Sequence, residues 1–221
     1  MTVAAIVLAP DTDAALADAD GEPVIRRVAH AAWAGGALPI VIVSGEVGGP
    51  LANAVADLPV ALALPDAGTS PGIGWFVSGL GAAVAGVAET TAALLWPFRH
   101  AWVDPETVTS LVEAHGVTPN AIVQPAYAGQ AGFPILVPTT LADRLAGWSD
   151  LHGPEAVAAL IADGVPTRVL ELGDPGIVND IATPRSGLPP YQGPPQPVAG
   201  PPPEWNSELA AEAQRSGEST R

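Results

Sequence analysis

Seven short apolar runs lie in the first 183 residues, and they constrain the fold more than any other feature of the chain. Each run is continuous, and glycine, proline or aspartate bounds it. Such runs are typical of strands that are buried on both faces of a parallel sheet. The predicted strands cover residues 3–9, 39–43, 60–64, 92–96, 121–124, 134–137 and 167–171.

Helix signals separate most of these runs. Asp104 is suited to cap a helix over residues 104–115, and Pro105 is suited to its first turn. Residues 154–163 have a similar pattern. The alternation predicts an α/β fold of three layers, in which a mostly parallel sheet has helices on both faces. Within residues 121–137, two short strands without a helix between them predict a small antiparallel excursion near one sheet edge.

The composition of the chain changes near residue 184. Nine of the 25 prolines lie in residues 184–203, which contain few apolar side chains. Such a segment cannot bury enough surface to offset its loss of conformational entropy. We therefore expect an α/β domain over residues 1–184 and a Pro-rich, disordered tail over residues 185–221. A short helix over residues 204–214, which carries Trp205, is an alternative that would let the tail bind a protein partner.

The chain contains neither lysine nor cysteine, and its formal net charge is -15. These facts exclude lysine-based phosphate loops, Schiff bases, thiolate nucleophiles and zinc–cysteine sites. An acidic chain with eight arginines cannot assemble the basic face that nucleic acids or anionic membranes require. No run reaches the roughly 18 apolar residues of a membrane helix. We expect a cytoplasmic protein without a nucleic-acid or membrane partner.

In an open α/β sheet, ligands bind beyond the carboxyl ends of the strands. The predicted loops there cover residues 10–22, 65–79, 97–103 and 172–183. The second loop is rich in glycine, and it includes Gly72, Gly74, Ser78 and Gly79 around the start of a helix predicted over residues 76–87. Its backbone amides could approach an anion at the helix N-terminus. An ordinary flexible connection is the alternative.

Arg99 and His100 follow the predicted strand over residues 92–96, so we expect them at the ligand-binding edge. An arginine there could bind a phosphate or carboxylate with two hydrogen bonds, and a histidine could exchange protons near neutral pH. The alternative is a surface arginine and a histidine packed between Trp96 and Trp102.

The remaining acidic and histidine residues give weaker signals. The first loop carries five acids, Asp11, Asp13, Asp18, Asp20 and Glu22, without a basic residue among them. The ligand spacing of a calcium loop is missing, which favours a solvated acidic face that repels a triphosphate. His30, His115 and His152 lack the spacing of a metal pair, so we expect structural or solvent-exposed roles for them.

Six groups of residues occur in an order and at a spacing that resemble one enzyme family. They are AAIVLA at 4–9, DGEPVIRRV at 20–28, GIG and SGL at 72–74 and 78–80, VDPET at 103–107, QPAYAGQAGFP at 124–134, and DPGI with DIATP at 174–177 and 180–184. Together they resemble the MobA-like NTP transferase family, particularly its molybdenum-cofactor cytidylyltransferase branch. The resemblance implies a nucleotide-diphospho-sugar transferase-like fold and Mg²⁺-dependent nucleotidyl transfer.

The chain departs from this family at the positions that carry its chemistry. An acidic loop over residues 10–20 replaces the glycine- and lysine-containing phosphate loop. Arg99 and Ala182 align with the two metal-binding aspartates, Phe133 aligns with a histidine, and Asp180 is retained. The resemblance therefore implies that the fold is kept and that the catalytic site is largely lost. We assign no catalytic or metal-binding residue.

Three hypotheses follow. In the first, a non-catalytic or repurposed member binds a nucleotide or molybdopterin-like molecule, or acts as an accessory protein, and Arg99 replaces Mg²⁺ and pairs with Asp180. In the second, an active enzyme uses Mg²⁺ on a molybdopterin or sugar-phosphate acceptor and needs a site built from Asp104, Asp174 and Asp180. In the third, the tail recruits a protein partner. The candidate ligand-binding residues are Gly72, Gly74, Ser78, Gly79, Arg99, His100 and Asp180, and only the second hypothesis requires a cofactor, Mg²⁺.

Overall fold

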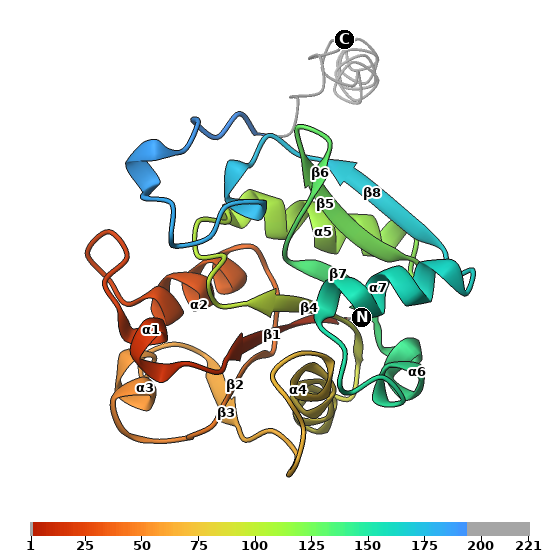
Figure 1. Ribbon diagram of the computed structural model, residues 1–221, viewed down its shortest axis with the longest axis horizontal. Helices are drawn as coiled ribbons and strands as arrows, with labels where there is room; N and C mark the ends of the chain where they lie inside the picture. The colour runs from red at the N-terminus through yellow and green to blue at the C-terminus, as the bar shows by residue number, and fades with distance from the viewer. Residues whose placement is uncertain (1, 194–221) are drawn as a thin grey trace, which may run out of the picture.

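The apolar runs form the strands of a mixed sheet with helices on both of its faces, as Figure 1 shows for the computed structural model, which describes residues 2–193. All seven predicted strands are present, together with a two-residue strand, β6. The strands are β1 (Thr2–Ala9), β2 (Ile40–Ser44), β3 (Val60–Ala63), β4 (Thr90–Pro97), β5 (Ile122–Tyr127), β6 (Gln130–Ala131), β7 (Ile135–Pro138) and β8 (Thr167–Glu171). Their order is β3-β2-β1-β4-β7-β5-β6, and β8 pairs with β5. The predicted α/β class is confirmed.

Strand β1 lies at the centre of the parallel part of the sheet, between β2 and β4. Its residues from Val3 to Ala9 are all buried, with Ala4 and Ile6 in the core on one face and Ala5 and Val7 in the core on the other. A strand covered on both faces has no solvent side, which is why its sequence is continuously apolar. The carboxyl ends of β1 and β4 are neighbours, and the candidate site lies beyond them.

The predicted antiparallel excursion consists of β5, β6 and β7. Strands β5 and β6 form a hairpin at one end of the strand order, and β7 returns antiparallel to both β5 and β4. In the strand order, β6 is at the end, and β7 lies further inside the sheet, between β4 and β5. Phe133 lies in the chain between β6 and β7, close to the carboxyl end of β4, where Leu95 pairs with Ile135.

The helices form two layers around the sheet. They are α1 (Thr12–Leu16), α2 (Val24–Ala34), α3 (Gly49–Ala54), α4 (Ile73–Gly86), α5 (Pro105–Val117), α6 (Ala142–Ala146) and α7 (Gly153–Ala162), with short 3-10 helices η1 (Thr139–Leu141), η2 (Pro175–Ile177) and η3 (Arg185–Gly187). Buried residues of α2 and α5 belong to one core, and those of α4, α6 and α7 belong to the other. Asp104 caps α5 as predicted, because its side chain accepts a hydrogen bond from the Glu106 amide at 3.0 Å. None of the helices described between residues 2 and 193 could cross a membrane.

Residues 184–193, here called the C-terminal strap, pack against the fold. Leu188 contacts the core, the Tyr191 hydroxyl donates to Glu106 at 3.0 Å, and the Gln192 amide donates to the Gly173 carbonyl at 3.0 Å. The predicted boundary after residue 184 is therefore too early, because one leucine and one tyrosine anchor a Pro-rich segment. The helix predicted over residues 204–214, with Trp205, lies outside the described residues.

Candidate ligand-binding site

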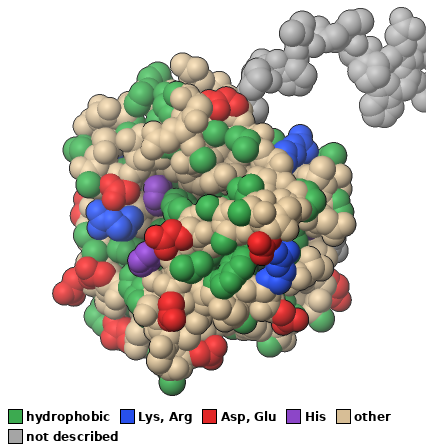
Figure 2. Space-filling model, turned by 45° about the vertical axis from the view of Figure 1, so that its right-hand side comes forward, with side chains coloured by type: hydrophobic (Ala, Val, Ile, Leu, Met, Phe, Trp, Pro, Cys, Tyr) green, Lys and Arg blue, Asp and Glu red, His purple; other side chains and the backbone are tan. Residues whose placement is uncertain are grey.

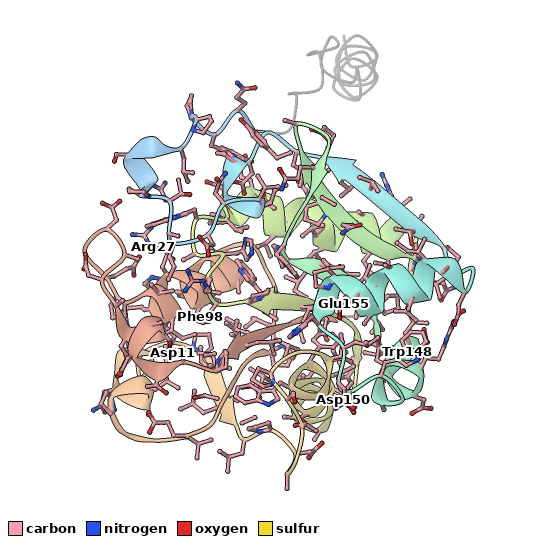
Figure 3. All side chains as sticks on the ribbon, viewed as in Figure 1. Asp11, Arg27, Phe98, Trp148, Asp150 and Glu155 are labelled. Atoms are coloured by element: carbon pink, nitrogen blue, oxygen red, sulfur yellow. The ribbon has the colours of Figure 1, made fainter. Side chains whose placement is uncertain are left out.

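A cavity of about 340 Å³ lies beyond the carboxyl ends of β1 and β4, at the edge that the fold class predicted. The starts of α4 and α7 and the chain between β6 and β7 complete its walls. Phe98 and Glu155, labelled in Figure 3, mark its β4 and α7 sides. Its lining residues are Leu8, Pro10, Pro71, Gly72, Leu95, Pro97, Phe98, Arg99, His100, Phe133, His152, Gly153 and Pro154.

The charged group of the cavity is the Arg99 guanidinium, whose Nε donates to Asp180 Oδ2 at 2.9 Å. The two side chains are 46% and 32% exposed, and their residues are 81 positions apart in the chain. Asp180 also accepts a hydrogen bond from the Ala182 amide at 2.8 Å. Burial opposes ionisation of Asp180, but the amide and the guanidinium outweigh it and hold the pKa of Asp180 below its ordinary value. The pairing expected from the sequence is thus present.

His100 lines the cavity beside this pair, and its ring lies 4.9 Å from the ring of Phe133. Burial lowers the pKa of His100, although Asp180 and the Gly176 carbonyl act in the opposite direction. A lowered pKa favours the neutral imidazole. On the backbone side, the Trp96 indole donates to the His100 carbonyl oxygen at 2.9 Å.

The glycine-rich loop contributes one cavity residue, Gly72, which precedes α4 with a φ of 150° that side chains rarely tolerate. The backbone amides of the first two residues of α4 already donate hydrogen bonds to carbonyls of the protein. The Ile73 amide donates to the Leu151 carbonyl and the Gly74 amide to the Ser149 carbonyl, each at 3.1 Å. The predicted approach of an anion to these two amides is therefore wrong, because another part of the backbone occupies them.

Ser78 and Gly79 lie away from the cavity and organise α4. The Ser78 hydroxyl accepts from the Asp66 amide at 3.0 Å and donates to the Gly74 carbonyl at 2.9 Å. A Cβ on Gly79 would come within 2.6 Å of side-chain atoms of Val43 and Ile6, so this glycine lets α4 approach the sheet closely. Of the seven candidates, Gly72, Arg99, His100 and Asp180 come together, whereas Gly74, Ser78 and Gly79 do not.

The cavity lining also includes His152, for which a structural or solvent-exposed role was expected; it is exposed and immediately precedes α7. The segment that contains Trp148 and Asp150, both labelled in Figure 3, crosses the start of α4 and brings His152 to the cavity. This placement depends on long-range contacts, and no local spacing in the sequence signals it. His30 and His115 have the structural roles expected of them, since they contact Glu22 at 3.2 Å and Thr91 at 3.0 Å.

The acidic first loop is partly neutralised in three dimensions. Glu22 faces Arg27 at 3.3 Å and His30 at 3.2 Å, and Arg27 also lies 5.5 Å from the centre of the Trp102 ring. Asp11 caps α1 by accepting a hydrogen bond from the Ala14 amide at 3.0 Å. The expectation of an uncompensated acidic face is therefore wrong for Glu22, because its basic partners come from α2.

The residues present do not fit the Mg²⁺ that the family resemblance implies. Within residues 2–193, no group of three or more histidine and carboxylate side chains is arranged to hold a metal. Each carboxylate that the second hypothesis requires is already engaged: Asp180 with Arg99, Asp104 as the cap of α5, and Asp174 in a buried hydrogen-bond network.

That network makes Asp174 an unsuitable metal ligand. The carboxylate is 1% exposed and accepts three hydrogen bonds, from the Asp104 amide at 2.9 Å, the Thr107 hydroxyl at 2.7 Å and the Gly176 amide at 2.8 Å. Burial raises the pKa of Asp174, and the three donors reduce that rise. Its lone pairs therefore serve the folded structure.

The comparisons with known proteins agree with this fold. A sequence model of the MobA-like NTP transferase domain matches residues 11–166. A search of curated proteins gave no significant match.

Solved structures of several nucleotidyltransferases share the fold. A nucleotidyl transferase from Methanothermobacter is 18% identical, with a TM-score of 0.67 and coverage of 80% of this chain and 91% of that one. A 2-C-methyl-D-erythritol 4-phosphate cytidylyltransferase from Thermus thermophilus is 15% identical, with a TM-score of 0.60 and coverage of 83% and 94%. A Mycobacterium tuberculosis protein in complex with manganese is 21% identical, with a TM-score of 0.57 and coverage of 78% and 89%.

Proposed function

Because the chain belongs to the MobA-like NTP transferase domain family, we propose that it keeps this nucleotidyltransferase fold to bind a ligand and no longer transfers nucleotides. The observation that carries the proposal is the Arg99–Asp180 ion pair at the carboxyl end of β4. The resemblance places a metal-binding carboxylate at the position of Arg99. A guanidinium there supplies a fixed positive charge and repels a cation.

The proposal follows from the charge that nucleotidyl transfer must stabilise. Metal ions in such reactions neutralise the phosphate oxygens that gain charge and orient the attacking group. One guanidinium carries half the charge of Mg²⁺, and Asp180 already offsets it. The site thus has positive charge for binding a modest anion, but it lacks the metal-centred charge that a displacement at phosphorus requires.

Binding that does not depend on metal is the first expected result. We would measure thermal unfolding with CTP, GTP, ATP and molybdopterin, each with Mg²⁺ and with EDTA. At least one ligand should raise the Tm equally in both conditions, and Arg99→Ala should abolish that rise. Arg144→Ala is the matched control, because Arg144 forms a similar 2.9 Å pair with Asp163 and neither residue lines the cavity. A rise that requires Mg²⁺, or that persists in Arg99→Ala, contradicts the proposal.

The absence of transfer is the second expected result. Pyrophosphate release would be measured with CTP or GTP, Mg²⁺ and a molybdopterin or sugar-phosphate acceptor, in protein whose cooperative unfolding shows that it is folded. We expect no release above background. Mg²⁺-dependent release would establish the second hypothesis, an active nucleotidyltransferase, in place of this one.

We also propose that the protein acts in the cytoplasm, since a chain without cysteine suits a reducing compartment. A protein partner for the C-terminal residues remains a separate proposal. Because the C-terminal strap packs on the fold, a deletion that tests this partner should begin at residue 194 and keep the strap. If the deleted protein captures the same partners as the full chain, the tail does not recruit them.

A further inference from the structure

We propose that the cavity beyond β4 binds a flat ring that carries one carboxylate group. This inference rests on the proposed function, because it names the class of ligand that a metal-free site of this kind accepts. Shape, charge and the remaining hydrogen-bonding capacity of Arg99 support it independently.

The shape of the cavity favours a flat ring. Phe98, Phe133 and His100 contribute aromatic side chains to its lining, and four prolines contribute rigid apolar ones. Aromatic side chains gain contact energy from stacked or edge-on ring ligands, and a volume of about 340 Å³ is at the small end of the range for ligand pockets. On the face shown in Figure 2, histidine side chains lie next to apolar ones and close to an arginine that touches an acidic group. This lining suits a compact ring better than an extended, highly charged chain.

The charge of the cavity favours a single negative charge. Arg99 is the one arginine in its lining, and burial lowers the pKa of the half-buried His100. Asp180 balances much of the Arg99 charge at 2.9 Å. A monoanion adds one unit of charge next to this pair, whereas a triphosphate adds several units at a site with no metal carboxylates and with α4 amides that are already used.

Arg99 retains the geometry for a carboxylate. Its Nε donates to Asp180, and within residues 2–193 neither Nη1 nor Nη2 donates to a protein acceptor. These two terminal nitrogens can make the paired hydrogen bonds by which a guanidinium binds a planar carboxylate. Asp180 therefore orients the guanidinium through Nε, while the two Nη atoms of Arg99 can donate to the ligand.

Four probes separate these requirements: benzoate, its neutral analogue benzamide, the non-flat monoanion cyclohexanecarboxylate, and CTP. Amide chemical-shift titrations without metal would measure each Kd and locate binding through Gly72 and Gly153. We expect benzoate to shift both amides and to bind about fivefold tighter than benzamide, in line with one solvent-accessible ion pair. We also expect it to bind tighter than the other two probes.

Variants test which residue provides each preference. Arg99→Ala should remove the advantage of benzoate over benzamide, while the control Arg144→Ala should leave it unchanged. Phe133→Leu should reduce the advantage of benzoate over cyclohexanecarboxylate, and its thermal unfolding shows whether it folds. If Phe133→Leu does not fold, the Arg99 comparison still decides the charge requirement.

The remaining outcomes overturn the inference. Equal binding of benzoate and benzamide, absence of benzoate binding in the millimolar range, or shifts confined to other amides would each do so. Metal-independent CTP binding that is tighter than benzoate binding refutes the ligand class and leaves the proposed function intact. Mg²⁺-dependent pyrophosphate release refutes the proposed function whatever the four probes show.

Discussion

Asp174 and Asp180 lie six positions apart in the segment after β8, yet they are in opposite environments. Asp174 is 1% exposed, accepts three hydrogen bonds and has a pKa raised by burial. Asp180 is one-third exposed, pairs with Arg99 and has a pKa held below its ordinary value. The first carboxylate joins α5 to η2, while the second orients a guanidinium at a cavity.

This contrast shows how one loop can serve both stability and binding. Asp174 accepts hydrogen bonds from amides at the start of α5 and in η2, so these two segments keep a fixed position relative to each other. Further along the same segment, the Ile181 amide donates to the Arg99 carbonyl at 2.9 Å. This hydrogen bond links the segment that contains both aspartates to the cavity. We infer that the buried carboxylate of Asp174 helps to fix the position of Asp180.

The largest expected effect is that of Asp174→Ala. It leaves two amides and one hydroxyl buried without their acceptor, which costs about 3–5 kcal/mol of unfolding free energy. Urea unfolding followed by circular dichroism measures this loss. A loss below about 1 kcal/mol would show that water or another acceptor replaces the carboxylate, and the contrast with Asp180 would fail.

A smaller loss is expected from Leu188→Ala in the C-terminal strap, which lies over the Asp174 side of the molecule. Leu188 is half-buried against the core, so we expect about 1–2 kcal/mol in the same unfolding measurement. Leu64→Ala is the control, because that leucine is 55% exposed and should cost less than about 0.5 kcal/mol. Equal effects of the two substitutions would show that the strap does not stabilise the fold.

The pH dependence should have opposite signs at the two carboxylates. The raised pKa of Asp174 means that its contribution to stability is present below pH 3.8 and is lost as the pH rises through its folded-state pKa. The lowered pKa of Asp180 gives a contribution that is present above pH 3.8 and is lost as the pH falls through its folded-state value.

Carboxyl carbon NMR titrations measure both pKa values directly. Asp174 should titrate above 3.8 and Asp180 below it, and Arg99→Ala should raise the pKa of Asp180 while leaving that of Asp174 in place. If Asp174 and Asp180 have the same pKa, their environments do not differ in the way that the structure indicates.

The smallest expected effect on stability is that of Asp180→Asn. The Arg99 pair is solvent-exposed, so its loss should change the unfolding free energy by less than about 1 kcal/mol. Ligand binding should weaken more than stability, because Arg99 loses the group that orients it. If Asp180→Asn binds ligands as tightly as the wild-type protein, Asp180 does not position Arg99 for binding.

Local signals predicted the fold well. The continuous apolar runs located the seven strands, and Asp104 with Pro105 located the start of α5, because burial and capping act over a few neighbouring residues. The rule for open α/β sheets also placed Arg99 beyond the carboxyl end of β4, where it lines the cavity.

The sequence did not reveal contacts that depend on distant segments. The carbonyls of Ser149 and Leu151 occupy the α4 amides, and His152 reaches the cavity from the same segment. Likewise, Leu188 and Tyr191 anchor a strap whose proline content predicted disorder. Each depends on packing between elements far apart in the chain, for which composition and spacing carry no signal.

Arg99 and Asp180 form an ion pair at the position where the family resemblance implies a metal-binding aspartate. The most direct test is Mn²⁺ binding to the wild-type protein and to Asp180→Asn, measured by electron paramagnetic resonance. The ion pair predicts weak binding in both proteins, with no difference between them. A single tight Mn²⁺ site in the wild-type protein that disappears in Asp180→Asn would contradict it.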